Sequence, residues 1–188
     1  MAFRSAAPGR LPRDRRDGWD RIHAAATAFD RPLKLLIVCA PFYRDIADAL
    51  LAGARAELEA VAAAHETVEV PGALEVPQAI RIAHRQSNFD GFVALGCVIR
   101  GETSHYETVC NESAHGLTLL GLEGACIGNG ILTVEDHDQA MARADPTRGD
   151  KGGGAAAAAL HLIALSRRFG PEAKGVGFRP PPGGLDLA

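Results

Sequence analysis

The chain has 188 residues with a formal net charge of −3, and 47% of its residues are hydrophobic while 23% are charged. This balance is typical of a protein with one sizeable core, and it excludes an overall basic surface for nucleic acid. No run of the roughly 18–20 apolar residues that span a bilayer is present, and no apolar signal region follows the N-terminal arginines. We therefore expect a cytoplasmic protein without nucleic-acid or membrane partners.

Four expected strands alternate with segments of helical period. The strands are residues 33–40, 66–70, 91–99 and 125–132, of which 33–40 and 91–99 are continuous apolar runs. The expected helices run from 45 to 61, from 75 through 82, from 104, from 136 to 143, and from 155 to 168. No hairpin signal joins the strands, so the sequence predicts an α/β fold with a parallel sheet covered on both faces.

The two ends of the chain differ from its middle. Residues 1–31 are rich in arginine and lack periodicity, which predicts a flexible N-terminal arm. Residues 171–188 contain several prolines and predict a disordered C-terminal tail. A single domain is expected over residues 32–170. Its four cysteines have no CxxC spacing, which indicates free thiols rather than disulfides or metal ligands.

His105 is the sharpest candidate for chemistry. It follows an apolar strand and a glycine break, and Ser104 with Glu107 fits a capping box that would place His105 in the first helical position. There the helix dipole favours the neutral imidazole, which can accept a proton. An ordinary surface histidine at a helix start is the alternative interpretation.

The residues before His105 suit an anion. Gly101, Glu102 and Thr103 precede a helix N-terminus whose free N–H groups can bind a phosphate oxygen, although the charge of Glu102 opposes this. Arg143 and Lys151 are two cations, eight residues apart, that would fit a phosphate clamp. A helix C-terminal charge and a solvated lysine are the simpler interpretation of that pair.

Three further features have two interpretations each. Phe42, beyond the first strand, fits either a stacking face for a planar heterocycle or a buried loop anchor. Glu75 fits either a ligand group or a residue that complements the helix dipole. The acidic segment 135–138 fits either a metal site or the first turn of a helix. Acidic residues are common in a first helical turn, so we expect no metal. No GxGxxG, GxxxxGK[ST] or GxSxG motif is present.

Several segments resemble one known family. Residues 70–77 (VPGALEVP), 94–106 (ALGCVIRGETSHY), 130–133 (GILT) and 143–152 are similar, in order and spacing, to the signature segments of the 6,7-dimethyl-8-ribityllumazine synthase family. The resemblance covers about residues 33–169. It implies a flavodoxin-like, three-layer αβα sandwich with a four-stranded parallel sheet, and pentamers or pentamer-based assemblies with sites between neighbouring subunits.

The resemblance also implies an activity. The family is a transferase of riboflavin biosynthesis that condenses 5-amino-6-(D-ribitylamino)uracil with 3,4-dihydroxy-2-butanone 4-phosphate, releases phosphate and water, and needs no metal or other cofactor. By position, His105 matches the proton-transfer histidine, and Gly101, Glu102, Thr103, Arg143 and Lys151 match phosphate-binding residues. The matching substrate-binding residues are Phe42, Ala73, Leu74, Glu75, Cys97, Val98 and Ile99.

One position departs from the family pattern. Asn129 stands where many members have a ring-stacking phenylalanine, so hydrogen bonding replaces a stacking face there. Asparagine at this position resembles variants found in smaller assemblies and favours a pentamer or decamer over a shell. Two other classes stay open at this point. They are a weakly active or non-catalytic flavin- or lumazine-binding paralogue, and a flavodoxin-like signalling module.

Overall fold

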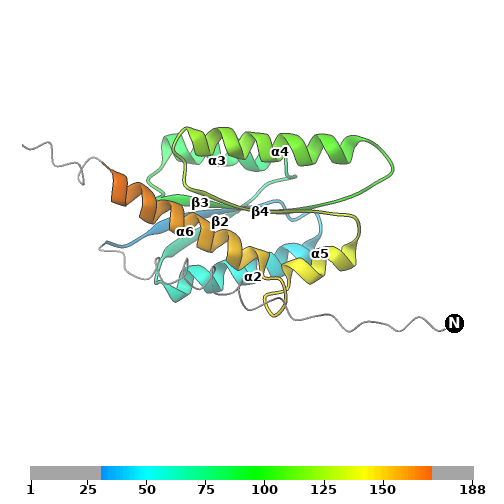
Figure 1. Ribbon diagram of the computed structural model, residues 1–188, viewed down its shortest axis with the longest axis horizontal. Helices are drawn as coiled ribbons and strands as arrows, with labels where there is room; N and C mark the ends of the chain where they lie inside the picture. The colour runs from blue at the N-terminus through cyan, green and yellow to red at the C-terminus, as the bar shows by residue number, and fades with distance from the viewer. Residues whose placement is uncertain (1–30, 171–188) are drawn as a thin grey trace, which may run out of the picture.

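Strands and helices alternate along residues 31–170, the part of the chain that the computed structural model describes (Figure 1). The expected tail and nearly all of the expected arm lie outside these residues. The elements are β1 (Lys34–Cys39), α2 (Arg44–Ala60), β2 (Ala64–Glu69), α3 (Glu75–Gln86), β3 (Gly91–Ile99), α4 (His105–Leu122), β4 (Ile127–Val134), α5 (His137–Ala144) and α6 (Lys151–Phe169). This order confirms the α/β prediction.

The four strands form one parallel sheet in the order β2-β1-β3-β4. The register pairs Leu35 of β1 with Gly91 of β3, and Phe92 of β3 with Ile127 of β4. β1 and β3 are therefore central, which explains why both are continuous apolar runs buried on two faces. β2 and β4 are at the edges, and both alternate between more and less exposed residues.

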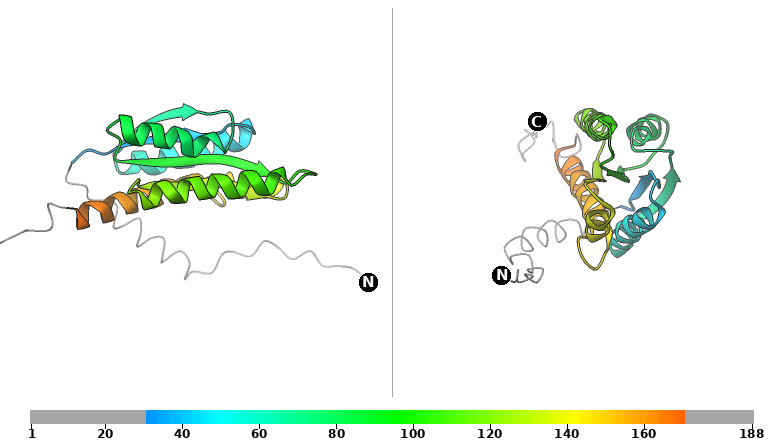
Figure 2. Two further views of the ribbon diagram at one scale, coloured as in Figure 1. Left: turned by 90° about the horizontal axis from the view of Figure 1, so that it is seen from above. Right: turned by 90° about the vertical axis from the view of Figure 1, so that its right-hand side faces the viewer.

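Helices cover both faces of the sheet, as the resemblance implied. α3 and α4 lie on one face, and α2, α5 and α6 lie on the other (Figures 1 and 2). Successive side chains of β1 and β3 point to opposite faces, so each face has its own core. The α2–α6 face includes Ile37, Leu50, Leu95 and Leu160, and the α3–α4 face includes Leu36, Ile80, Ala94 and Leu120.

The last helix begins earlier than its sequence predicts. We expected it from residue 155, and the three glycines at 152–154 each disfavour a helix by about 1 kcal/mol. It begins at Lys151 instead, since the Asp150 carboxylate accepts a hydrogen bond from Gly153 N at 3.0 Å. Close packing also selects glycine, because a Cβ at Gly152 would lie 2.0 Å from the Leu50 carbonyl oxygen of α2.

The same helix packs directly on the edge strand β4. A Cβ built at Gly128 would lie 1.8 Å from the carbonyl oxygen of Ala155, so the strand and the helix meet backbone to backbone there. Small residues on both elements permit this approach. None of the helices within residues 31–170 has the length and apolar character needed to cross a membrane.

Candidate active site

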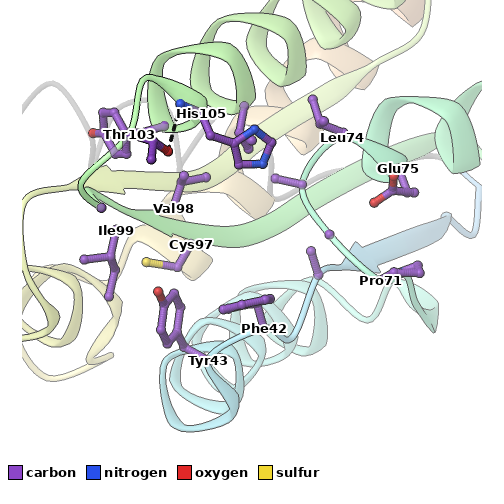
Figure 3. Close-up of a pocket in the computed structure, with 16 residues that line it drawn as sticks. Phe42, Tyr43, Pro71, Leu74, Glu75, Cys97, Val98, Ile99, Thr103 and His105 are labelled. Carbon is purple, nitrogen blue, oxygen red and sulfur yellow. Dashed lines mark hydrogen bonds between the residues drawn. The ribbon is translucent and has the colours of Figure 1, made fainter.

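A cavity of about 450 Å³ opens at the carboxyl ends of β1, β2 and β3 (Figure 3). This is the edge of a parallel sheet where α/β proteins bind ligands, because loops leave the sheet there and helix N-termini point toward it. Three segments line the cavity: the β1–α2 connection, the β2–α3 connection, and the end of β3 with the start of α4. Segments far apart in the sequence thus meet at one site.

The end of β3 forms a largely apolar wall. Cys97, Val98 and Ile99 all line the cavity. Burial raises the pKa of the Cys97 thiol to about 11, so the group is a neutral thiol at pH 7 and not a nucleophilic thiolate. This wall offers shape and low polarity to a bound ring rather than reactive chemistry.

Phe42 forms the wall opposite β3 (Figure 3). Its side chain is 74% exposed, which excludes the interpretation as a buried loop anchor. The ring packs edge-on against Tyr43, with centroids 5.1 Å apart and planes at 71°. Tyr43 therefore supports the Phe42 ring while its face stays accessible to a planar ligand.

The β2–α3 connection adds a short polar rim. Ala73, Leu74 and Glu75 line the cavity, and Glu75 is the first residue of α3. Its carboxylate lies over Gly72, where a Cβ would be 3.1 Å from Glu75 Oε2. A carboxylate at this rim can accept hydrogen bonds from the hydroxyl groups of a ligand.

His105 begins α4 and lines the cavity, as the sequence predicted for its place in the helix. Its backbone N–H donates a hydrogen bond to Thr103 Oγ1 at 3.4 Å (Figure 3). Among the described residues, none makes a hydrogen bond with the imidazole ring. The ring is therefore available to a ligand, and Gly101 and Thr103 lie on the same side of the cavity.

The predicted capping box at α4 is wrong. Ser104 adopts helical dihedral angles (φ −66°, ψ 0°) and its side chain makes no capping hydrogen bond. Glu107, the other half of the motif, pairs with Arg100 instead. The Ser104 hydroxyl therefore occupies no N–H group of α4, although Thr103 Oγ1 accepts the His105 N–H, and a helix N-terminus without its capping box can bind an anion.

Comparisons with known proteins give one consistent family. Residues 32–167 match the family model described as 6,7-dimethyl-8-ribityllumazine synthase. A protein of that name from Jannaschia sp. (strain CCS1) is 63% identical over 153 residues, which cover 81% of this chain and 86% of the relative. Another from Sphingopyxis alaskensis is 60% identical over 136 residues, which cover 72% of this chain and 96% of the relative.

The chain belongs to the 6,7-dimethyl-8-ribityllumazine synthase family. A further relative, 6,7-dimethyl-8-ribityllumazine synthase 1 of Rhizobium meliloti, is 53% identical over 148 residues. Every segment that lines the cavity lies within the matched range of 32–167. The family assignment and the geometry of the cavity therefore concern the same part of the molecule.

Four residues that the family resemblance pointed to lie outside the cavity of a single copy. Glu102 is exposed on the loop, Arg143 is in the last turn of α5, Lys151 is the first residue of α6, and Asn129 lies in β4. Gly149 packs on the backbone of Arg143, where a Cβ would be 2.7 Å from the Arg143 Cα. The loop before Lys151 therefore folds back onto the end of α5.

Asn129 occupies a different surface from the cavity. It lines a second hollow of about 550 Å³, between the C-terminal halves of α4 and α6 along the edge of β4. Its side-chain Oδ1 accepts a hydrogen bond from Ile131 N at 3.0 Å, and the residue is exposed. Within residues 31–170, no residue lines both this hollow and the cavity of Phe42 and His105.

Several lining residues were missed by the sequence analysis. Pro71 and Gly72 lie in the VPGALEVP segment of the resemblance but were not predicted as site residues, and neither was Tyr43. Val109 lies four residues after His105 and three after Tyr106, so it shares a face of α4 with each of them, and this spacing was an available signal. Ala40 also lines the cavity, because it directly follows the last residue of β1.

The acidic segment at the start of α5 has structural partners. Asp136 caps the helix by accepting a hydrogen bond from Gln139 N at 2.8 Å, Glu135 pairs with Arg100, and His137 Nε2 lies 2.8 Å from Asp45 Oδ2. Within residues 31–170, no three His, Cys, Asp or Glu side chains gather as metal ligands would.

Proposed function

We propose that the chain condenses 5-amino-6-(D-ribitylamino)uracil with 3,4-dihydroxy-2-butanone 4-phosphate to 6,7-dimethyl-8-ribityllumazine. One observation carries the proposal beyond the family assignment: a stacking aromatic, an unpartnered histidine and a helix N-terminus line the same cavity. These are the groups that a planar pyrimidine, a proton transfer and a phosphate require. The relatives carry the name of this synthase, which supports the enzyme over the non-catalytic paralogue.

The walls of the cavity suggest where each part of the substrates binds. The pyrimidine stacks on Phe42 and faces the apolar end of β3, including Cys97. The ribityl chain extends along Ala73 and Leu74 to the Glu75 carboxylate, which accepts hydrogen bonds from its hydroxyls. These positions place the reacting amine on the side of the cavity where His105 lies.

The phosphate of the second substrate binds at the loop between β3 and α4. Gly101 and Thr103 line the cavity there, and backbone N–H groups at the start of α4 supply hydrogen-bond donors. Glu102 contributes its backbone rather than its carboxylate, because its exposed side chain is not part of the cavity wall. This arrangement holds the leaving group at one end of the site.

His105 transfers protons in each chemical step. The amine attacks the ketone carbon, the carbinolamine loses water to form a Schiff base, and loss of a proton from carbon allows the C–O bond to phosphate to break. The ring then closes with loss of a second water. One imidazole that alternates between base and acid serves all of these transfers, with a contribution on the order of 10²–10⁴-fold. Alignment of the two substrates contributes roughly 7–11 kcal/mol more.

We further propose that a second copy of the chain completes the site, in a homopentamer or a pentamer-based assembly. A phosphate dianion needs a cation, yet among the described residues no lysine or arginine lines the cavity of one copy. Arg143 and Lys151, whose segments pack together outside the cavity, supply that charge from the neighbouring copy. The same contact brings Asn129 to the bound ring as a hydrogen-bonding neighbour.

The proposal extends to the rest of the chain. The N-terminal arm adds as a strand to a neighbour's sheet, for which the edges of β2 and β4 are the open positions in the described fold.

The reaction needs no metal or redox cofactor. The protein works in the cytoplasm, where its free thiols at Cys39, Cys97, Cys110 and Cys126 stay reduced.

Mixing both substrates with the purified protein tests the activity. Lumazine absorbance should appear together with one equivalent of inorganic phosphate, and neither should form when the protein is omitted. A yellow-green fluorescent protein that binds the product but produces neither signal would contradict the proposal and favour a non-catalytic carrier.

Mixing two impaired variants tests the shared site. His105→Ala and Arg143→Ala remove groups that the proposal places in one site but in different copies. Unfolding and refolding the two variants together should restore activity, because some sites then combine an intact His105 with an intact Arg143. Activity that stays at the level of the separate variants, in an assembly that sedimentation shows to be mixed, would contradict the shared site.

A further inference from the structure

The side chain of Arg100 joins three parts of the molecule beside the cavity. Arg100 directly follows β3, and its backbone N–H donates to the Val134 carbonyl oxygen at 3.0 Å. Its Nε donates to Glu135 Oε2 at 2.7 Å, and a terminal nitrogen donates to Glu107 Oε1. The guanidinium carbon also lies 4.1 Å from the centroid of the Tyr106 ring. One planar cation thus contacts the start of α4 and the β4–α5 connection together.

These contacts bracket the loop that we assign to phosphate. The loop, residues 101–104, begins immediately after Arg100 and ends at α4, whose first turn carries Tyr106 and Glu107. Within the described structure, the only side-chain hydrogen bond of the loop joins Thr103 to His105 N. A Cβ at Gly101 would meet nothing within 4 Å, so packing does not hold the loop there. The anchors at its two ends therefore set its shape.

The contacts also balance charge. Glu107 and Glu135 are carboxylates close to a site that must accept a dianion, and like charges would oppose its binding. Hydrogen bonding to Arg100 lowers the pKa of Glu107, so this residue is ionised at neutral pH and its charge is compensated. Without Arg100, two negative charges next to the loop would lack their partner.

We propose that Arg100 is a positioning residue for the reaction, which holds both ends of the phosphate loop and compensates the carboxylates beside it. The inference rests on the proposed function, because it concerns the same phosphate site. Arg100 is not part of the cavity wall, and two of its nitrogens already bind carboxylates, so it acts through the loop and not as a ligand of the phosphate.

The test compares four proteins: wild type, Arg100→Ala, the triple variant with Arg100→Ala, Glu107→Gln and Glu135→Gln, and the control Arg81→Ala. Arg81 pairs with Glu123 between α3 and α4, away from the cavity, and so matches Arg100 as an exposed ion-paired arginine. The measurements are kcat, the KM of each substrate, and competitive inhibition by inorganic phosphate.

Arg100→Ala should raise the KM of the phosphate-bearing substrate and the inhibition constant of phosphate roughly tenfold, because two carboxylates lose their counter-charge. The KM of the pyrimidine should stay near the wild-type value. The triple variant should recover part of the phosphate affinity, since it removes the uncompensated charges. Arg81→Ala should behave as wild type.

Two results would overturn the inference. One is an Arg100→Ala protein that binds phosphate like wild type. The other is a triple variant as weak as Arg100→Ala, which would show that the uncompensated carboxylates do not weaken phosphate binding. If Arg100→Ala does not fold, Arg100→Lys takes its place. Lysine keeps the charge but lacks the planar guanidinium, so the inhibition constant of phosphate should lie between the wild-type value and a tenfold increase. A wild-type protein that forms no lumazine and ignores phosphate would instead contradict the proposed function.

Discussion

Phe42 and His105 lie on opposite walls of one cavity, although 63 positions separate them in the numbering (Figure 3). Phe42 follows β1 and His105 begins the helix after β3, and these two strands are hydrogen-bonded neighbours in the sheet. The parallel arrangement therefore brings both residues to the same edge. An aromatic face opposite a free imidazole suits a reaction in which a flat ring is held while protons move.

His105 and Arg143 should differ in their effects on catalysis. His105→Ala removes one proton-transfer group, which contributes on the order of 10²–10⁴-fold. Arg143→Ala removes charge from a phosphate that must be both positioned and expelled, so it should lower kcat/KM by a larger factor. Steady-state kinetics on the two variants gives the comparison. Near wild-type turnover of Arg143→Ala at a low concentration of the phosphate substrate would show that the clamp assignment is wrong.

Phe42→Ala should weaken binding of the pyrimidine substrate without unfolding the protein. Stacking of a base on an aromatic side chain contributes about 1–3 kcal/mol, so the KM of that substrate should rise roughly 5- to 150-fold. The melting temperature should not change, because the Phe42 side chain is 74% exposed. Phe42→Tyr keeps the ring and serves as the control. Equal effects of alanine and tyrosine would argue against stacking.

Glu107→Gln should reduce the loss of stability at acidic pH. The hydrogen bond from Arg100 lowers the pKa of Glu107 below its ordinary value of 4.5, so the folded state binds the proton less readily than the unfolded chain. The resulting stability is present above pH 4.5 and is lost as the pH falls through the lowered value. Between pH 5 and pH 3, the melting temperature of Glu107→Gln should therefore fall less than that of wild type.

Glu69→Gln tests the same effect of pH on stability at a second, independent ion pair. Hydrogen bonding to Arg44 lowers the pKa of Glu69, and this pair shares no residue with the Arg100 pair. The two substitutions should therefore have additive effects on the fall in melting temperature between pH 5 and pH 3. The same fall in melting temperature for wild type and both variants would contradict the assignment of these ion pairs.

Gly128→Ala should destabilise the fold strongly. Its new Cβ would lie 1.8 Å from the Ala155 carbonyl oxygen, so β4 and α6 must separate, at a cost of about 3 kcal/mol or more. Gly121→Ala is the matched control, since a Cβ there meets nothing within 4 Å and alanine favours a helix over glycine by about 0.5–1 kcal/mol. Chemical denaturation measures both. A Gly128→Ala protein as stable as wild type would mean that this packing is looser than described.

Local patterns in the sequence predicted much of the fold. The apolar runs at 33–40 and 91–99 indicated central strands, and the two strands lie in the middle of the sheet. The helical period between strands indicated the crossover helices. Local patterns succeed here because burial on two faces imposes a continuous apolar run, and a helix covering a sheet imposes its own period.

Local patterns failed where distant groups compete. Ser104 and Glu107 have the spacing of a capping box, but Arg100 attracts Glu107 and the box does not form. The glycines at 152–154 discourage a helix locally, but α2 lies so close that only glycine fits at 152, and the helix forms. In both places a tertiary contact outweighed a local preference of about 1 kcal/mol.

By itself the sequence determined the fold class, the family, and His105 as the first residue of its helix, because each depends on short segments read in order. Only the tertiary structure decided that Tyr106 and Pro71 join Phe42 and His105 around one cavity, and that Arg143, Lys151 and Asn129 do not. The reason is physical: which residues share a cavity depends on strand order and on the directions of side chains at the sheet edge. Those relationships are set by packing between segments far apart in the chain.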